Sequence, residues 1–102
     1  MITRIVKLEF EEDRIDDFLN FFEGIKHIVN GFPGCHGMKL YQDINRPWIV
    51  MTYSHWDSQE SLDNYRQSPQ FGQIWPKIKP WFAAKPDAWS VSAYFNGFET
   101  QK

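Results

Sequence analysis

The chain has 102 residues, of which 11 are basic and 13 acidic, and its formal net charge is −2. This length favours a single domain. The mixed charges provide no basic stripe for phosphates, so we expect no nucleic-acid partner. The single cysteine excludes an internal disulfide and cysteine-rich metal sites. Aromatic residues make up 18% of the chain, which favours a pocket, a subunit interface or a core lined by rings.

Residues 2–10 form the first expected strand, because apolar and polar side chains alternate along them. Arg4 stands on the apolar face of this strand, either as a strand-end residue with a buried stem or as a ligand for an anion or oxyanion. No signal peptide precedes the strand, and no apolar run reaches the length of a membrane span. We therefore expect a soluble, cytoplasmic protein with no membrane partner.

The next elements are a helix and two strands. Apolar residues recur at helical spacing from about residue 13 to 30, which predicts a helix with one core-facing stripe. Strands are expected over 35–44 and 48–56, joined by a hairpin turn. The strand 48–56 is apolar on both faces, with Thr52 and Trp56 on one and His55 on the other. Such a strand is central, or is covered by helices on one side and by a partner on the other.

A helical region follows directly. Asp57 with Glu60 predicts a capping box that opens a helix over 57–67. Ser68 and Pro69 then predict a new helix start, as N-cap and first helical residue. Its apolar stripe reaches residue 82, and a last strand is expected over 88–95, followed by a polar tail at 96–102.

The expected order is βαββαβ, an α+β ferredoxin-like domain with a core of about residues 2–95. Its four-stranded antiparallel sheet carries helices on one face and leaves many rings on the other face. An open apolar patch of that size is typical of an interaction site, so we expect a homodimer in which two sheets pack face to face.

The segment 53–62, Tyr-Ser-His-Trp-Asp-Ser-Gln-Glu-Ser-Leu, resembles the signature of the antibiotic biosynthesis monooxygenase family, together with residues 65–68 and Phe71. In that family a strand ends in Trp, and a short acidic cap and a helix with an S-x-x-F step follow. The turn Phe-Pro-Gly-Cys at 32–35 resembles the family's PG turn. The resemblance covers most of residues 2–95. It implies a dimeric α+β barrel with one ligand cavity per subunit, between sheet and helices.

The resemblance also implies which activities to expect. Some members oxidise anthrones or quinols with molecular oxygen and no metal or flavin, some degrade haem, and many have no demonstrated activity. The Asn, Trp and His of the haem degraders fall at Val6, Tyr65 and Trp75, so haem degradation is not expected. The anthrone oxidisers place an Asn four residues before the strand-end Trp and a Tyr six after it. Trp56 is retained, whereas the other two positions hold Thr52 and Leu62.

His55 and Trp56 are the predicted catalytic residues. A histidine has the right ordinary pKa for a general base, and Trp56 would supply a pocket wall and an N–H donor. The alternatives are a surface histidine at a strand end and a core or interface tryptophan. Strand alternation places the two on opposite faces, so both line one pocket only if the strand bends. The remaining predicted pocket residues are Arg4, His36, Thr52, Tyr65, Phe71 and Trp75.

The sequence contains no His and carboxylate set with metal-ligand spacing and no glycine-rich phosphate loop, so we expect neither a metal nor another cofactor. Two functions follow. The first is a cofactor-independent monooxygenase, an oxidoreductase that uses O2 on a quinol-like or polycyclic aromatic small molecule. The alternative is a non-catalytic dimer that binds a small ligand or has a stress-related role.

Overall fold

The computed structural model describes residues 1–99, and their main elements follow the predicted βαββαβ order with the second helical region divided in two. The elements are β1 (Ile2–Glu9), α1 (Ile15–Asn30), β2 (Cys35–Gln42), β3 (Ile49–Trp56), α2 (Gln59–Arg66), α3 (Pro69–Ile78) and β4 (Asp87–Val91). Short 3-10 turns lie at Glu12–Arg14, Lys79–Trp81 and Gly97–Glu99.

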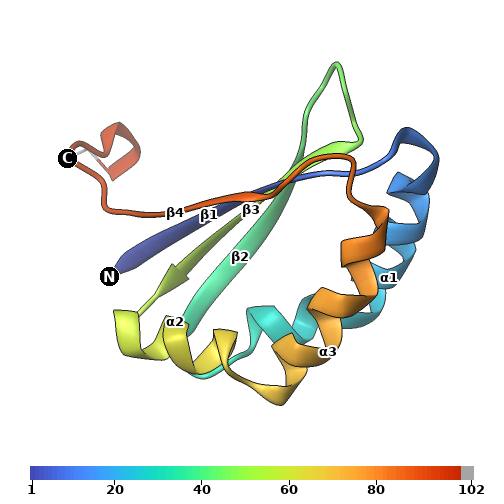
Figure 1. Ribbon diagram of the computed structural model, residues 1–102. Helices are drawn as coiled ribbons and strands as arrows, with labels where there is room; N and C mark the ends of the chain where they lie inside the picture. The colour runs from blue at the N-terminus through green and yellow to red at the C-terminus, as the bar shows by residue number, and fades with distance from the viewer. Residues whose placement is uncertain (100–102) are drawn as a thin grey trace.

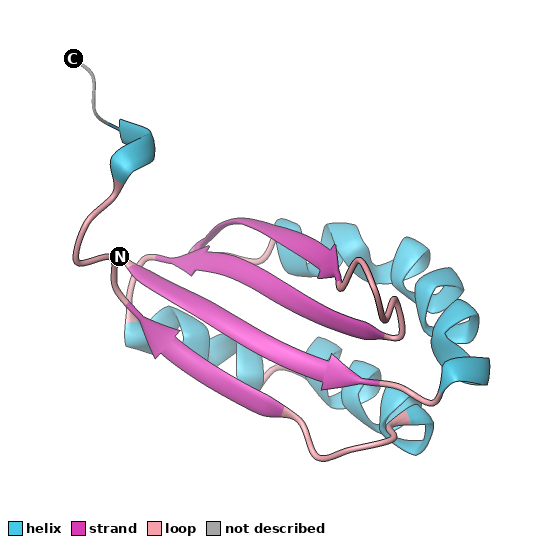
Figure 2. Cartoon of the chain, turned by 90° about the horizontal axis from the view of Figure 1, so that it is seen from above, coloured by secondary structure: helices cyan, strands magenta, loops and turns pink. Residues whose placement is uncertain are grey.

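The strands form one antiparallel sheet in the order β2-β3-β1-β4. Figure 1 shows α1, α2 and α3 on one side of this sheet, and Figure 2 shows the same layering from above, with the helices beneath the strands. The predicted α+β ferredoxin-like architecture is confirmed. One face of the sheet therefore meets helices, while the opposite face lies open.

The core lies where the end of β1 meets α1 and the end of α3. It consists of Leu8, Phe10, Phe18, Val50 and Ile78, all almost fully buried. The rings of Phe10 and Phe18 stack with their centroids 4.4 Å apart. Burying a side chain of this kind contributes roughly 1.5–3 kcal/mol, so this cluster fixes the helices against one end of the sheet.

The predicted last strand, 88–95, is wrong in its second half, since β4 ends at Val91. The pairing register explains the early end. Val91 lies opposite Thr3 on β1, so residue 93 would face Met1 and residue 95 would have no partner on β1. The chain then leaves the sheet, and Tyr94, Phe95 and Phe98 are exposed on a segment that projects from the body in Figure 1.

The predicted helix start at Asp57 is also wrong by two residues. Ser58 is the N-cap of α2, and its hydroxyl accepts a hydrogen bond of 3.2 Å from the Ser61 backbone N–H. Asp57 stays outside the helix because its backbone N–H donates to the Gly34 carbonyl at 2.8 Å and its carboxylate pairs with His36. The start of α3 is as predicted, with Ser68 as N-cap and Pro69 in the first turn.

None of the helices formed by residues 1–99 combines the length and the apolar character needed to cross a membrane.

Candidate functional site

A cavity of about 460 Å³ lies between the sheet and the helices. Its lining includes side chains from all four strands and from α1, α2 and α3. Pockets of roughly 300–1,000 Å³ with mostly apolar walls and a few polar groups are typical of small-molecule sites. This cavity has both properties, and we treat it as the candidate functional site.

Four aromatic side chains form a continuous wall of the cavity. Trp56 and Tyr65 stack with their ring centroids 5.3 Å apart, and Tyr65 meets Phe71 edge-on at 5.2 Å. Phe71 and Trp75 then stack at 5.7 Å with an interplanar angle of 15°. Offset and edge-on geometries of this kind are the favourable ones for aromatic pairs. The four rings therefore form one continuously packed aromatic group along the cavity.

Trp56 stands at the end of β3 and is only 1% exposed. Its indole N–H donates a hydrogen bond of 2.9 Å to the hydroxyl of Ser54, two residues earlier on the same strand face. This bond fixes the plane of the indole ring. The ring thus serves as a rigid wall, and its N–H already has a partner within the protein.

The turn before β2 holds α2 in place beside Trp56. Gly34 adopts a positive φ of 89°, and a Cβ atom at this position would lie 2.4 Å from the Ser61 hydroxyl. Only glycine permits this close approach without strain. Because the turn packs directly on the first turn of α2, Leu62 and Tyr65 reach the cavity.

Tyr65 is the titratable phenol of the cavity wall. Burial, with a smaller effect from Cys35, raises the pKa of its hydroxyl to about 12. The phenol is therefore neutral across the physiological pH range, since burial disfavours the charged form. In this state Tyr65 can donate a hydrogen bond but cannot act as a base.

Arg4 lies on the helix-facing side of β1, in the floor of the cavity. The register places it opposite Ser54 on β3 and opposite Ser90 on β4. Its Nη1 donates a hydrogen bond of 3.1 Å to the Ser90 hydroxyl. Burial, and next the positive charge of Arg66, lower the pKa of Arg4 from its ordinary value. Both effects disfavour the charged form of the guanidinium.

Most of the predicted site residues come together in this cavity. Its lining includes Arg4, Thr52, Trp56, Tyr65, Phe71 and Trp75. His55 lies on the opposite, open face of the sheet, where Nδ1 shares a hydrogen bond of 3.3 Å with the Thr3 hydroxyl and the ring meets Tyr53 edge-on. β3 does not bend enough to bring the His55 side chain beside Trp56. His36 is exposed and pairs with Asp57 outside the cavity.

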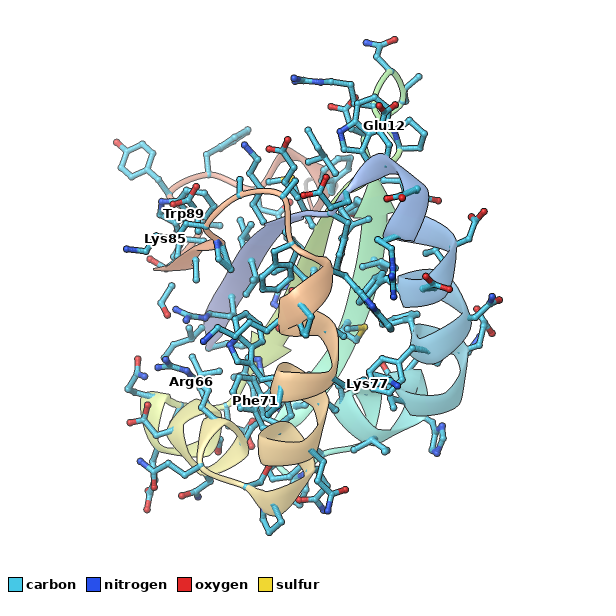
Figure 3. The ribbon with its side chains drawn as sticks, turned by 45° about the vertical axis from the view of Figure 1, so that its right-hand side comes forward. Glu12, Arg66, Phe71, Lys77, Lys85 and Trp89 are labelled. Atoms are coloured by element: carbon cyan, nitrogen blue, oxygen red, sulfur yellow. The ribbon has the colours of Figure 1, made fainter. Side chains whose placement is uncertain are left out.

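Three further polar residues line the cavity and were not among the predicted site residues. They are Ser54, Arg66 and Lys85. Ser54 shares its strand face with Thr52 and Trp56, so the alternation of β3 contains a signal for it. Arg66 is at the end of α2, and Lys85 precedes β4. Figure 3 shows both cations on the same side of the molecule, with Phe71 near Arg66.

Across residues 1–99, no group of three or more His, Cys, Asp or Glu side chains is arranged so that it could hold a metal ion. The polar groups of the cavity are hydroxyls and cations. Such groups bind oxygen atoms of an organic ligand.

Comparisons with solved structures agree with the fold. A structure of an antibiotic biosynthesis monooxygenase is similar over 91% of this chain and 98% of that chain, with 18% identity and a TM-score of 0.85. A conserved protein from Methanosarcina mazei Go1 has 21% identity, coverage of 89% and 91%, and a TM-score of 0.82. Rv0793 from Mycobacterium tuberculosis has 12% identity, coverage of 94% and 97%, and a TM-score of 0.83.

These identities are low, so the structures establish the shared fold alone. The search of curated proteins gave no match. The sequence model of the antibiotic biosynthesis monooxygenase family matches residues 1–76, which include β1 to β3 and all four residues of the aromatic wall. The chain belongs to the antibiotic biosynthesis monooxygenase family.

Proposed function

We propose that this protein is a cofactor-independent monooxygenase that oxidises a quinol-like or polycyclic aromatic molecule with O2. The observation that carries the proposal is the aromatic wall of Trp56, Tyr65, Phe71 and Trp75 along a cavity of about 460 Å³. A planar substrate moves from water into the cavity and stacks on this wall. Family membership supports the reaction class.

The reaction needs no external reductant, because the substrate supplies the electrons. In the anthrone-like case, a ring CH2 group becomes a carbonyl, one oxygen atom enters the product, and the second leaves as water with the two hydrogens. The protein contributes orientation and stabilisation of the electron-rich oxygen of the substrate. Thr52 and the neutral phenol of Tyr65 both line the cavity and are the hydrogen-bond donors for this oxygen.

The two predicted catalytic residues have different places in this proposal. Trp56 is a fixed wall of the substrate site, because its N–H is bonded to Ser54. His55 lies on the open face of the sheet, and a role in catalysis would require contact through a partner subunit. The His55→Ala variant therefore tests whether His55, although it lies on the open face, takes part in catalysis.

We also propose that the open faces of two sheets pack together in a homodimer. The pairing register aligns Lys39, Tyr53, Ile5 and Trp89 in one row across all four strands. Tyr41, Met51 and Val91 add further exposed apolar surface on the same face. A monomer rarely exposes a contiguous apolar patch of this kind. The exposed rings of Tyr94, Phe95 and Phe98 extend this surface beyond β4 toward a partner.

Oxygen consumption with a panel of hydroquinones and anthrones tests the proposed activity. Turnover is expected without added metal or flavin and in the presence of a chelator. Trp56→Phe and Thr52→Val should lower kcat/KM, whereas the matched change of an exposed hairpin residue, Ile44→Val, should leave it unchanged.

Retained turnover in His55→Ala would exclude His55 as the catalytic base. If the whole panel binds but none of its members consumes oxygen, the monooxygenase proposal fails. The non-catalytic ligand-binding alternative then becomes the better account of the cavity.

A further inference from the structure

The charged residues of the cavity are all cations. The lining includes Arg4, Arg66 and Lys85, and no acidic side chain of residues 1–98 lines it. This distribution contrasts with the whole chain, whose net charge is −2. A cavity with three positive charges and apolar walls is electrostatically suited to an anion.

Among the side chains that the structure describes, no carboxylate forms an ion pair with any of these three cations. The ion pairs in the described part of the chain are Arg14 with Asp17, Lys26 with Glu23, and His36 with Asp57. Arg4 donates to the Ser90 hydroxyl, which uses one of the five N–H groups of a guanidinium. The rest of the Arg4 fork has the geometry that suits two oxygens of a carboxylate.

The surroundings of Arg4 also favour a bound anion. Its guanidinium is partly desolvated in the cavity floor, and the charge of Arg66 acts on it unfavourably, as the lowered pKa of Arg4 indicates. Partial burial beside a second positive charge disfavours the charged form of a guanidinium. A bound anion would relieve the repulsion between the two guanidiniums and supply the missing hydrogen-bond acceptors.

We propose that the aromatic ligand carries a carboxylate, which Arg4 binds at the cationic side of the cavity. Arg66 and Lys85 add electrostatic attraction, and the ring of the ligand stacks on the aromatic wall. The inference rests on the proposed function for the aromatic part of the ligand. It adds the chemical class, an aromatic acid. Three cations exceed what a single transient oxyanion requires, and Arg66 and Lys85 are exposed, where they can guide an anion from solvent.

A matched pair of probes tests this class. 1-Hydroxy-2-naphthoate and its methyl ester differ in the carboxylate charge, and binding of each can be measured by isothermal titration calorimetry. The wild-type protein should bind the acid about tenfold or more tightly than the ester. Added salt should reduce that preference, because exposed Arg66 and Lys85 are screened.

Variants assign the preference to residues. Arg4→Gln should weaken binding of the acid about tenfold and leave the ester nearly unchanged. The control Arg46→Gln removes the same charge from the exposed β2–β3 hairpin and should change neither affinity. If Arg4→Gln does not fold, the double variant Arg66→Gln/Lys85→Gln serves instead, and it should also lose acid affinity selectively.

Equal binding of acid and ester, or equal loss of both in these variants, overturns the inference. The result is separate from the test of activity, since neither probe needs to be oxidised. Quinol turnover without acid preference refutes the carboxylate site alone. Acid preference without any turnover refutes the monooxygenase proposal and leaves an aromatic-acid binding site.

Discussion

The indole N–H of Trp56 and the hydroxyl of Ser54 form a hydrogen bond of 2.9 Å in which both side chains are buried. The two residues are separated by one position on β3 and therefore share the helix-facing side of the strand. Because the bond is shielded from water, each group depends on the other for its hydrogen bond. The hydrogen bond within β3 thus fixes the orientation of the Trp56 ring.

Ser54→Ala should destabilise the protein, because it leaves the buried indole N–H without an acceptor. A loss of about 1–3 kcal/mol in the free energy of unfolding is expected from urea denaturation. The exposed Ser92→Ala is the control and should have little effect. In a double-mutant cycle with Trp56→Phe, the combined loss should be smaller than the sum of the single losses. Additive losses would contradict a direct coupling of the two side chains.

Gly34→Ala should destabilise the junction between the β2 turn and α2. The new methyl group would lie 2.4 Å from the Ser61 hydroxyl, and φ at this position is 89°. The backbone conformation alone costs an alanine roughly 1–2 kcal/mol. Thermal and urea unfolding should both show the loss.

The matched glycine is Gly24 in α1, where an added Cβ has no heavy atom within 4 Å. Gly24→Ala should stabilise the helix by roughly 0.5–1 kcal/mol. Similar effects of the two substitutions would show that the close contact at Gly34 has no special cost.

The raised pKa of Tyr65 predicts a loss of stability at alkaline pH. Its phenol has a pKa of about 12 in the folded protein against 10.0 for an ordinary tyrosine. Above pH 10.0 the unfolded chain releases this proton while the folded chain keeps it, so unfolding becomes more favourable until the pH reaches about 12. Tyr65→Phe keeps the ring but removes this effect.

The test compares urea midpoints of the wild type and Tyr65→Phe on both sides of pH 10.0, the ordinary tyrosine value. The stability difference between them should be constant below that pH and should move in favour of Tyr65→Phe above it. A difference that stays constant throughout would show that Tyr65 titrates normally in the folded protein.

Trp89→Glu should weaken the proposed dimer. Trp89 is 46% exposed on the open face and lies beside Ile5 in the row across the sheet. A carboxylate there would be desolvated without a partner if two such faces packed together. Light scattering at micromolar concentration should report a dimer for the wild type and a monomer for the variant. Ile44→Glu, at the 96% exposed hairpin position, should remain dimeric.

Removal of residues 92–102 tests the contribution of the C-terminal segment to the dimer. Tyr94 and Phe98 are fully exposed beyond β4, so their removal should cost the subunit little stability. If they contact a partner, the truncated chain should dissociate at a higher concentration than the full chain in analytical ultracentrifugation. Identical dissociation constants would exclude the segment from the interface.

The sequence was sufficient for β1 and β3, because an alternation of two residues assigns each side chain of a strand to one face. It predicts that Thr52 and Trp56 share one face of β3 and that His55 lies on the other. The early end of β4 could not be predicted, because it depends on which residue of β1 faces Val91. Such a register is a tertiary property.

The cations of the cavity show the same limit. Lys85 belongs to an irregular segment with no periodicity of its own, and its position depends on backbone bonds that tie the end of the helical region to β1. The Ala83 N–H donates to the Glu9 carbonyl at 2.8 Å, and Phe82 forms an isolated bridge with Phe10. The place of His36 outside the cavity has a related cause, since the register of β2 against β3 shifts between Cys35 and Met38.

The alternation of β3 has a consequence for how this protein can change during evolution. Ser54 and Trp56 face the helices, while Tyr53 and His55 face the open side. Substitutions at Ser54 or Trp56 would therefore act on the candidate site, and substitutions at Tyr53 or His55 on the proposed dimer face. A one-residue insertion in β3 would exchange the two sets at once. A change in the length of β3 should therefore disturb the candidate site and the proposed dimer face together.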